Sequence, residues 1–236
     1  NFKLKGIDEA ELKLAEMNKQ LESFSKKAKN DLETAFKGFG LSSADAKALA
    51  NQIKDAETLK QKLKEITEQR QKDLDKTKEQ AATKIATAQS KAGKTLLTPL
   101  KAKDIGGVKD PKEQGVVADI LNSEVTNQMR DVLNGSAKIE DVWEDIVKKA
   151  QQLGISLNNQ EAIQNKLQDA YNKMKTTMQD ATSEVEDAVA ALVKIGEVNT
   201  DGEFIPSGDA TTLIGDFDSL QQKIQESENE IIQLKQ

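Results

Sequence analysis

The chain of 236 residues contains no cysteine and no histidine. These absences exclude cysteine and histidine nucleophiles, histidine general bases, and zinc, haem and iron–sulfur sites that depend on those ligands. They also remove the side chain that most often changes its charge near neutral pH. The lack of cysteine fits either side of a membrane, so it leaves the redox compartment open.

Aromatic residues are scarce as well, at 3% of the chain, and apolar residues make up only 36%. Because aromatic side chains supply much of the buried area of a compact core, we expect narrow seams of Leu, Ile, Val and Ala instead. High contents of Ala, Glu, Lys, Gln and Leu favour helix. No apolar run approaches the ~18 residues of a spanning helix, and no signal peptide is visible. The first residue is Asn1 rather than Met, which leaves open whether a leader or other domains precede it.

Apolar and small residues recur at helical spacing along most of the chain. A heptad-like seam predicts a first helix over 8–37, with Asp8 at the start of a capping box. Ser42 or Ser43 is placed to cap a second helix over 43–92. The short loop between these helices predicts that they fold back on each other as an antiparallel hairpin.

The second predicted helix carries a stripe with an 11-residue period, which predicts a nearly straight or slightly right-handed seam. Its members are Leu59, Leu63, Ile66, Arg70, Leu74, Thr77, Ala81, Ile85, Ala88 and Ala92. The first helix is too short to cover this stripe. The part beyond about residue 70 therefore needs another partner or lies in solvent.

Four more helices are predicted in the rest of the chain, at 111–133, 136–153, 159–195 and 210–236, with Asp110 and Asn158 as N-caps. The segment TLLTPL at 95–100 reads as a short strand or an apolar plug. The last helix has a seven-residue apolar repeat that ends at Leu234.

These elements predict an all-α fold, an elongated helical bundle with a long antiparallel coiled-coil hairpin and one small β-hairpin near 197–206. Residues 1–94 form the long hairpin, and residues 95–154 form a loop and a knob of short helices. Residues 155–236 supply a long helix, the β-hairpin and a C-terminal heptad helix that packs back on the bundle. We expect these three segments to form one elongated domain.

The segment EVNTDGEF places oxygen-bearing side chains at alternate positions before a glycine and resembles an EF-hand or dockerin calcium loop. The closing carboxylate comes one residue late, because the twelfth position is a glycine. An Asp-Gly type I′ turn between two short strands is the other interpretation. The candidate calcium ligands are Glu197, Asn199, Asp201, Glu203 and Asp209.

Trp143 is the only tryptophan, and its neighbours at helical spacing are apolar. This indicates a core position, with an exposed binding hot spot as the alternative. The segment 131–152 around it resembles the closing helical pair of extracellular solute-binding proteins. The alternating strands of that α/β fold are missing, so the chain is assigned to no family.

Charge is distributed unevenly: residues 60–94 carry ten Lys or Arg and five Asp or Glu, whereas residues 176–236 carry three and thirteen. The two segments are expected either as solvated faces of opposite sign or, for 60–94, as a basic arm for an anionic surface polymer or lipid. The net charge of −6 and the lack of aromatics among these lysines disfavour nucleic acid.

No phosphate loop, GxSxG motif or carboxylate pair across a cleft can be recognised, so we nominate no catalytic residue and expect no enzyme. We expect a structural or interaction protein, a rigid helical spacer or adhesin-like module that is secreted, on a bacterial cell surface or in a phage particle. Its partner would be another protein or a second copy, bound through helix seams. A membrane-active helical protein (a pore-forming toxin or secretion-tip component) and a calcium- or small-ligand-binding module are the alternatives.

Overall fold

The computed structural model describes residues 2–235, with the side chains of residues 11–233. This part of the chain contains seven α-helices and two small antiparallel strand pairs, which confirms the predicted all-α class with a β-hairpin. The chain divides into two compact units. Unit 1 combines residues up to 75 with residues from 187 onward, and unit 2 is residues 76–186. The expected elongation and the division into three segments stay predictions.

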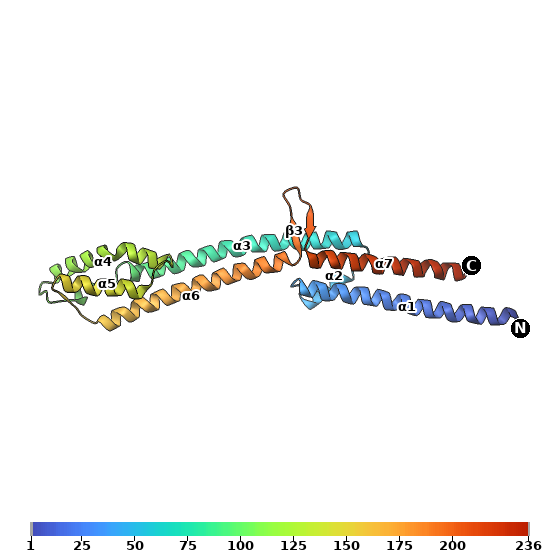
Figure 1. Cartoon of the computed structure of the whole chain (residues 1–236), viewed down its shortest axis with the longest axis horizontal. Helices are drawn as coiled ribbons and strands as arrows, with labels where there is room; N and C mark the ends of the chain where they lie inside the picture. The colour runs from blue at the N-terminus through green and yellow to red at the C-terminus, as the bar shows by residue number, and fades with distance from the viewer. Residues whose placement is uncertain (1, 236) are drawn as a thin grey trace. The chain divides into compact units, whose positions relative to one another are not determined.

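Unit 1 is built from α1 (Phe2–Gly38), α2 (Ser43–Ala50), the first part of α3 (Ala56–Leu96) and α7 (Gly208–Lys235). α1 and α7 lie side by side and run antiparallel, so the C-terminal helix packs back on the first (Figure 1). Their seam is narrow, as the composition predicts. Buried core residues of this unit are Leu32, Phe36, Phe39, Ala46, Ala50, Ile53, Leu59, Leu63, Ile195 and Ala210.

Two predicted boundaries in unit 1 are wrong. α1 begins at Phe2, so Asp8 lies within the helix rather than at its start. The helix predicted over 43–92 is broken between Ala50 and Ala56. The break has a local cause, because Asp55 Oδ1 accepts a hydrogen bond from the backbone N–H of Thr58 (2.6 Å) and so caps a new helix. Of the two predicted cap residues, Ser42 is the one that caps α2, since its Oγ accepts from the N–H of Asp45 (3.1 Å).

The stripe predicted along α3 is confirmed, because every one of its ten members is buried or half-buried. Arg70 is the polar member in unit 1. Its guanidinium donates to the carbonyl of Gly40 (2.8 Å) in the turn that ends α1. Gly40 takes a φ of 83°, a left-handed conformation that suits glycine after a helix C-terminus. Arg70 therefore supplies a hydrogen-bond donor to a backbone carbonyl in the turn that follows α1. The repeat on α7 is likewise buried or half-buried, except that the side chain of Leu234 lies outside the described residues.

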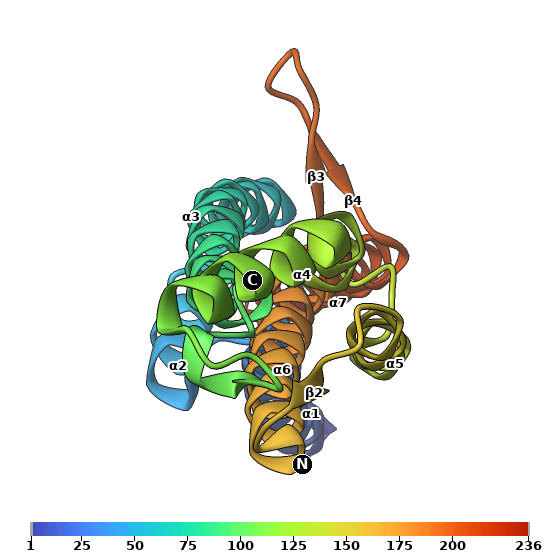
Figure 2. The same cartoon turned by 90° about the vertical axis from the view of Figure 1, so that its left-hand side faces the viewer.

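Unit 2 is built from the second part of α3, α4 (Pro111–Leu133), α5 (Ile139–Gln152) and the first part of α6 (Gln160–Val193). Figure 2 views α3 and α6 nearly end-on, with α4 crossing in front of them. A short 3₁₀ turn, η1 (Ala102–Asp104), leads into β1 (Ile105–Gly106), which pairs antiparallel with β2 (Ser156–Leu157). The largest buried core residues are Leu96, Ile105, Leu121, Met129, Ile146, Leu167 and Met174.

The loop after α3 is held to α4 by one buried side chain. Asn122 is 6% exposed; its Oδ1 accepts from the N–H of Leu100 (3.1 Å), and its Nδ2 donates to the carbonyl of Leu100 (3.0 Å). Leu96 and Leu100 are buried in the core of unit 2. Thus TLLTPL is the end of a helix followed by an apolar plug, and the strand alternative is wrong.

The predicted caps in unit 2 differ in outcome. Asp110 caps α4 as predicted, because its Oδ1 accepts from the N–H of Lys112 (2.9 Å). Asn158 does not have the predicted capping contact. Its N–H donates to the carbonyl of Asp104 (2.8 Å), and its Nδ2 donates to that of Lys103 (3.3 Å). Asn158 therefore tethers η1, and α6 begins two residues later, at Gln160.

The predicted β-hairpin is formed by β3 (Gly196–Val198) and β4 (Phe204–Pro206) and projects from the helices of unit 1 (Figures 1 and 2). Its turn is not type I′, which requires positive φ at both central residues. Gly202 has φ 78°, whereas Asp201 has a negative φ. The N–H of Gly202 donates to the carbonyl of Asn199 (3.0 Å), so a type I turn is followed by a left-handed glycine.

Candidate binding groove between α3 and α6

A groove of about 1200 Å³ runs between α3 and α6 within unit 2. Its walls come from Thr83–Thr95 of α3 and Ala162–Thr177 of α6. Pockets for small ligands typically measure about 300–1,000 Å³ and enclose most of the ligand. The α3 wall alone is about 18 Å long at 1.5 Å per residue. The groove therefore has the length of a chain segment rather than of a small molecule.

Three alanines and one methionine form the floor of the groove. Ala92 and Met174 belong to the buried core of unit 2, and Ala88 and Ala170 pack against it. Ala88 and Ala92 belong to the stripe predicted on α3, and Ala170 and Met174 lie four residues apart on one face of α6. Since alanine side chains are short, they leave space between the two helices that a further helix could approach closely.

The rim of the groove is basic, with Lys84, Lys91, Lys166 and Lys173 against one acid, Asp169. Lys84 is already paired, because its Nζ donates to both carboxylate oxygens of Glu184 on α6 (2.7 and 2.6 Å). Within the described part of the chain, no carboxylate forms an ion pair with the other three lysines. The rim thus retains an excess of positive charge.

The α6 side of this rim was not predicted from the sequence. Lys166 and Lys173 lie seven residues apart, with Asp169 and Ala170 between them, so they share one helical face. The same spacing occurs on many solvated helix faces. Only the position of α3 distinguishes this face as a groove wall.

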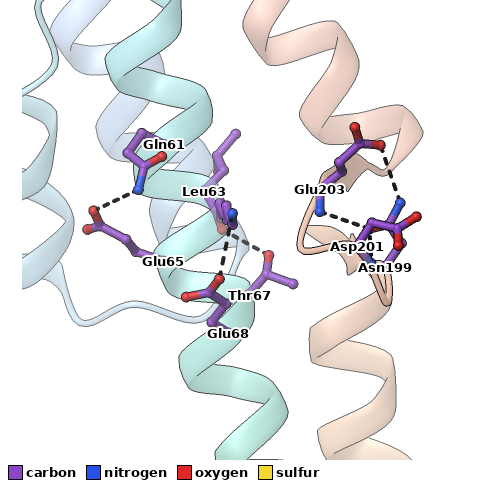
Figure 3. A network of polar contacts seen from close by, with 9 residues as sticks. Gln61, Leu63, Glu65, Thr67, Glu68, Asn199, Asp201 and Glu203 are labelled. Carbon is purple, nitrogen blue, oxygen red and sulfur yellow. Dashed lines mark hydrogen bonds and ion pairs between the residues drawn. The ribbon is translucent and has the colours of Figure 1, made fainter.

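The candidate calcium ligands lie in unit 1, and the structure brings three of them together at the hairpin turn (Figure 3). Asn199 Oδ1 accepts from the N–H groups of Asp201 (3.0 Å) and Glu203 (2.8 Å), so this oxygen already stabilises the turn. Glu197 lies on β3 opposite Ile205.

The fifth candidate, Asp209, is in the first turn of α7. Among the described residues, no group of three or more acidic side chains is arranged to hold a metal ion. Calcium binding at this loop stays a prediction.

Trp143 is 7% exposed and belongs to the core of unit 2, the position that its apolar neighbours indicate. Its ring does not line the groove. A binding role for Trp143 would require its ring to be uncovered.

Two carboxyl groups among the described side chains of unit 1 have displaced pKa values. Hydrogen bonds from Thr58 lower the pKa of Asp55. A hydrogen bond from Lys62 lowers the pKa of Glu65, and one from Gln61, which Figure 3 shows, adds to this shift, whereas burial opposes it. In both cases the cause is a neighbour within one turn of the same helix. These shifts therefore reflect helix capping and surface pairing rather than a partner across a cleft.

Comparisons of the chain with protein-family models, curated proteins and solved structures found no match. What defines the chain is its all-α fold, its projecting β-hairpin and the groove of unit 2. Among the described residues, no helix combines the length and apolar character needed to cross a membrane.

Proposed function

We propose that this chain is a non-enzymatic interaction protein, a helical spacer or adhesin-like module that holds a partner in the groove between α3 and α6. The groove itself carries the proposal. It is longer than a typical small-molecule pocket, and its alanine floor and lysine rim suit another macromolecule. We place this activity outside the cell or on its surface, an assignment that rests on the sequence pattern.

The use of the buried polar side chains supports a role without catalysis. Thr67 donates to the carbonyl of Leu63 (2.8 Å), and Asp104 accepts from the N–H of Lys101 (2.9 Å). Asn122 holds Leu100. Each of these groups is thus occupied in holding backbone, whereas catalytic groups are commonly held in clefts with perturbed pKa values.

Site-specific photo-crosslinking tests this proposal. A photoreactive residue at Ala162, which is exposed in the groove, is compared with one at Ser123, which is exposed on α4 outside it. Both variants are exposed to an extract of the cells that make the protein. We expect a discrete crosslinked protein from position 162 that excess unlabelled protein competes away. The same products from both positions, or none, would refute a partner in the groove.

A further inference from the structure

We propose that the groove between α3 and α6 binds an acidic amphipathic α-helix of another protein. This inference rests on the proposed function and names the chemistry of the partner. It depends on three properties of the groove, namely its length, its floor and its charge.

The length fits three to four turns of helix. The α3 wall extends from Thr83 to Thr95 and the α6 wall from Ala162 to Thr177, which correspond to about 18 and 22 Å of helix. α3 and α6 run antiparallel beside each other (Figure 1). A helix of about 12–15 residues could lie between them in the helix-in-groove mode of recognition.

The floor of the groove determines which residue types suit the face of the partner helix that packs against it. Helix axes approach to about 8–10 Å depending on the side chains at the contact, and small residues allow the closer distance. Ala88 and Ala170 are half-buried and Ala92 is buried, so short side chains cover the backbones of α3 and α6 along the floor, and a bound helix can approach them closely. We therefore expect Ala and Leu on the inner face of the partner rather than Trp or Phe.

The lysines of the rim favour acidic residues on the two sides of the partner helix. Lys91 from one wall and Lys166 and Lys173 from the other lack an ion pair with any described residue, and Asp169 offsets only part of their charge. Carboxylates on both flanks of a bound helix would meet these lysines. A second copy docking through the same groove would instead bring lysines against lysines, which is unfavourable. The groove also offers no aromatic ring on which nucleic-acid bases could stack.

Fluorescence anisotropy with a defined probe tests the inference. The probe is a capped, labelled 16-residue peptide with Ala and Leu at helical spacing on one face and Glu on both flanks. Its control peptide has Lys in place of every Glu. We expect the full-length chain to bind the Glu peptide with micromolar to submillimolar affinity at low salt. Binding should weaken markedly at 0.5 M salt, because exposed charges are screened.

Charge reversal in the groove is compared with charge reversal elsewhere in unit 2. The groove variant combines Lys91→Glu, Lys166→Glu and Lys173→Glu, and the matched control combines Lys109→Glu, Lys112→Glu and Lys138→Glu, all at exposed positions. We expect at least tenfold weaker binding for the groove variant and less than threefold for the control. Ala162→Trp, which fills an exposed part of the groove, should also weaken binding. Trp143 fluorescence monitors folding in the charge-reversal variants.

Any of three results of the peptide-binding experiments would overturn the inference. They are no binding of the Glu peptide up to 1 mM, equal binding of the Lys peptide, and equal losses in the two charge-reversed variants. A crosslinked partner at position 162 together with any of these would leave the proposed function standing while removing the acidic helix. A dimer in solution that the groove variant dissociates would also overturn it, in favour of a second copy.

Discussion

Replacing Asn122 by Ala should strongly destabilise unit 2. This side chain forms two hydrogen bonds to the backbone of Leu100, one as acceptor (3.1 Å) and one as donor (3.0 Å). Asn122 is 6% exposed and Leu100 is 3% exposed. The substitution therefore leaves a backbone N–H and a carbonyl in a place that water reaches poorly.

The magnitude follows from these two orphaned groups. A buried polar group without a partner costs about 1–3 kcal/mol. Some water entry into the space left by the amide would reduce this cost. We expect Asn122→Ala to lower the free energy of unfolding of unit 2 by about 2–4 kcal/mol.

Urea unfolding followed by the fluorescence of Trp143 measures this effect. Trp143 is the only tryptophan and lies in the core of unit 2, so its signal reports on that unit. The control is Asn127→Ala, because Asn127 is exposed on the same helix. It should change the free energy of unfolding by less than about 0.5 kcal/mol.

A second variant checks the hydrogen-bond argument by its pH dependence. In Asn122→Asp the carboxylate can still accept from Leu100, but it has no donor for the carbonyl. The pKa of the new carboxyl should therefore rise in the folded state, so its penalty is absent below the unfolded pKa of about 3.9 and grows above it. Two results would contradict a role of these hydrogen bonds in holding the loop after α3. One is that Asn122→Ala lowers the free energy of unfolding no more than Asn127→Ala does, and the other is that the stability of Asn122→Asp does not depend on pH.

Three further predictions concern unit 1. Gly196→Ala should disrupt the hairpin and lower the free energy of unfolding by about 1–3 kcal/mol. The reason is that φ is 141° at this position and that a Cβ would lie 2.3 Å from the carbonyl oxygen of Ile205. Thermal unfolding followed by circular dichroism measures the loss. Asp55→Asn should lose less stability than the wild type as the pH falls from 6 to 3. Hydrogen bonds from Thr58 lower the pKa of Asp55 in the folded state, so the ionised carboxylate stabilises the wild type above the unfolded pKa of about 3.9. This stabilisation is lost as the pH falls through the folded pKa. If the 197–209 loop binds calcium, excess calcium should raise the melting temperature, and Asp201→Ala should abolish the rise.

The controls for these experiments are also in the chain. Gly208→Ala should be tolerated, since a Cβ there meets nothing within 4 Å. Equal effects of Gly196→Ala and Gly208→Ala would contradict the close-approach argument. An identical pH profile for Asp55→Asn and the wild type would contradict the capping argument, because asparagine caps helices without titrating. An unchanged melting temperature with calcium and with chelator would remove the calcium hypothesis.

Much of the helical pattern could be predicted, because the spacing of apolar residues along a single helix indicates which of them are buried. The stripe from Leu59 to Ala92 and the start of α4 at Pro111 are examples. The break before Ala56 could not be predicted in this way. It depends on Asp55 as a cap and on Ile53 turning into the core of unit 1, which is a tertiary contact.

The groove and the β1–β2 pair were not predictable for a related reason. Two-residue strands have almost no pattern of their own, and the pairing of Ile105 with Leu157 joins parts of the chain that are far apart in sequence. The spacing between α3 and α6 is likewise a property of two helices together. A stripe of alanines reads the same whether its partner lies close or leaves a groove.

The division of the chain into units has a consequence for its biosynthesis. Unit 1 is assembled from both ends of the chain, whereas unit 2 is one uninterrupted stretch. At translation speeds of about 5–20 residues per second, roughly 8–30 seconds separate the synthesis of residue 75 from that of residue 236. During that interval α7 has not been made, so the apolar seam of α1 that it covers stays exposed. Unit 2 can already fold in the same interval. A ribosome-associated chaperone that covers this seam would act before α7 is synthesised.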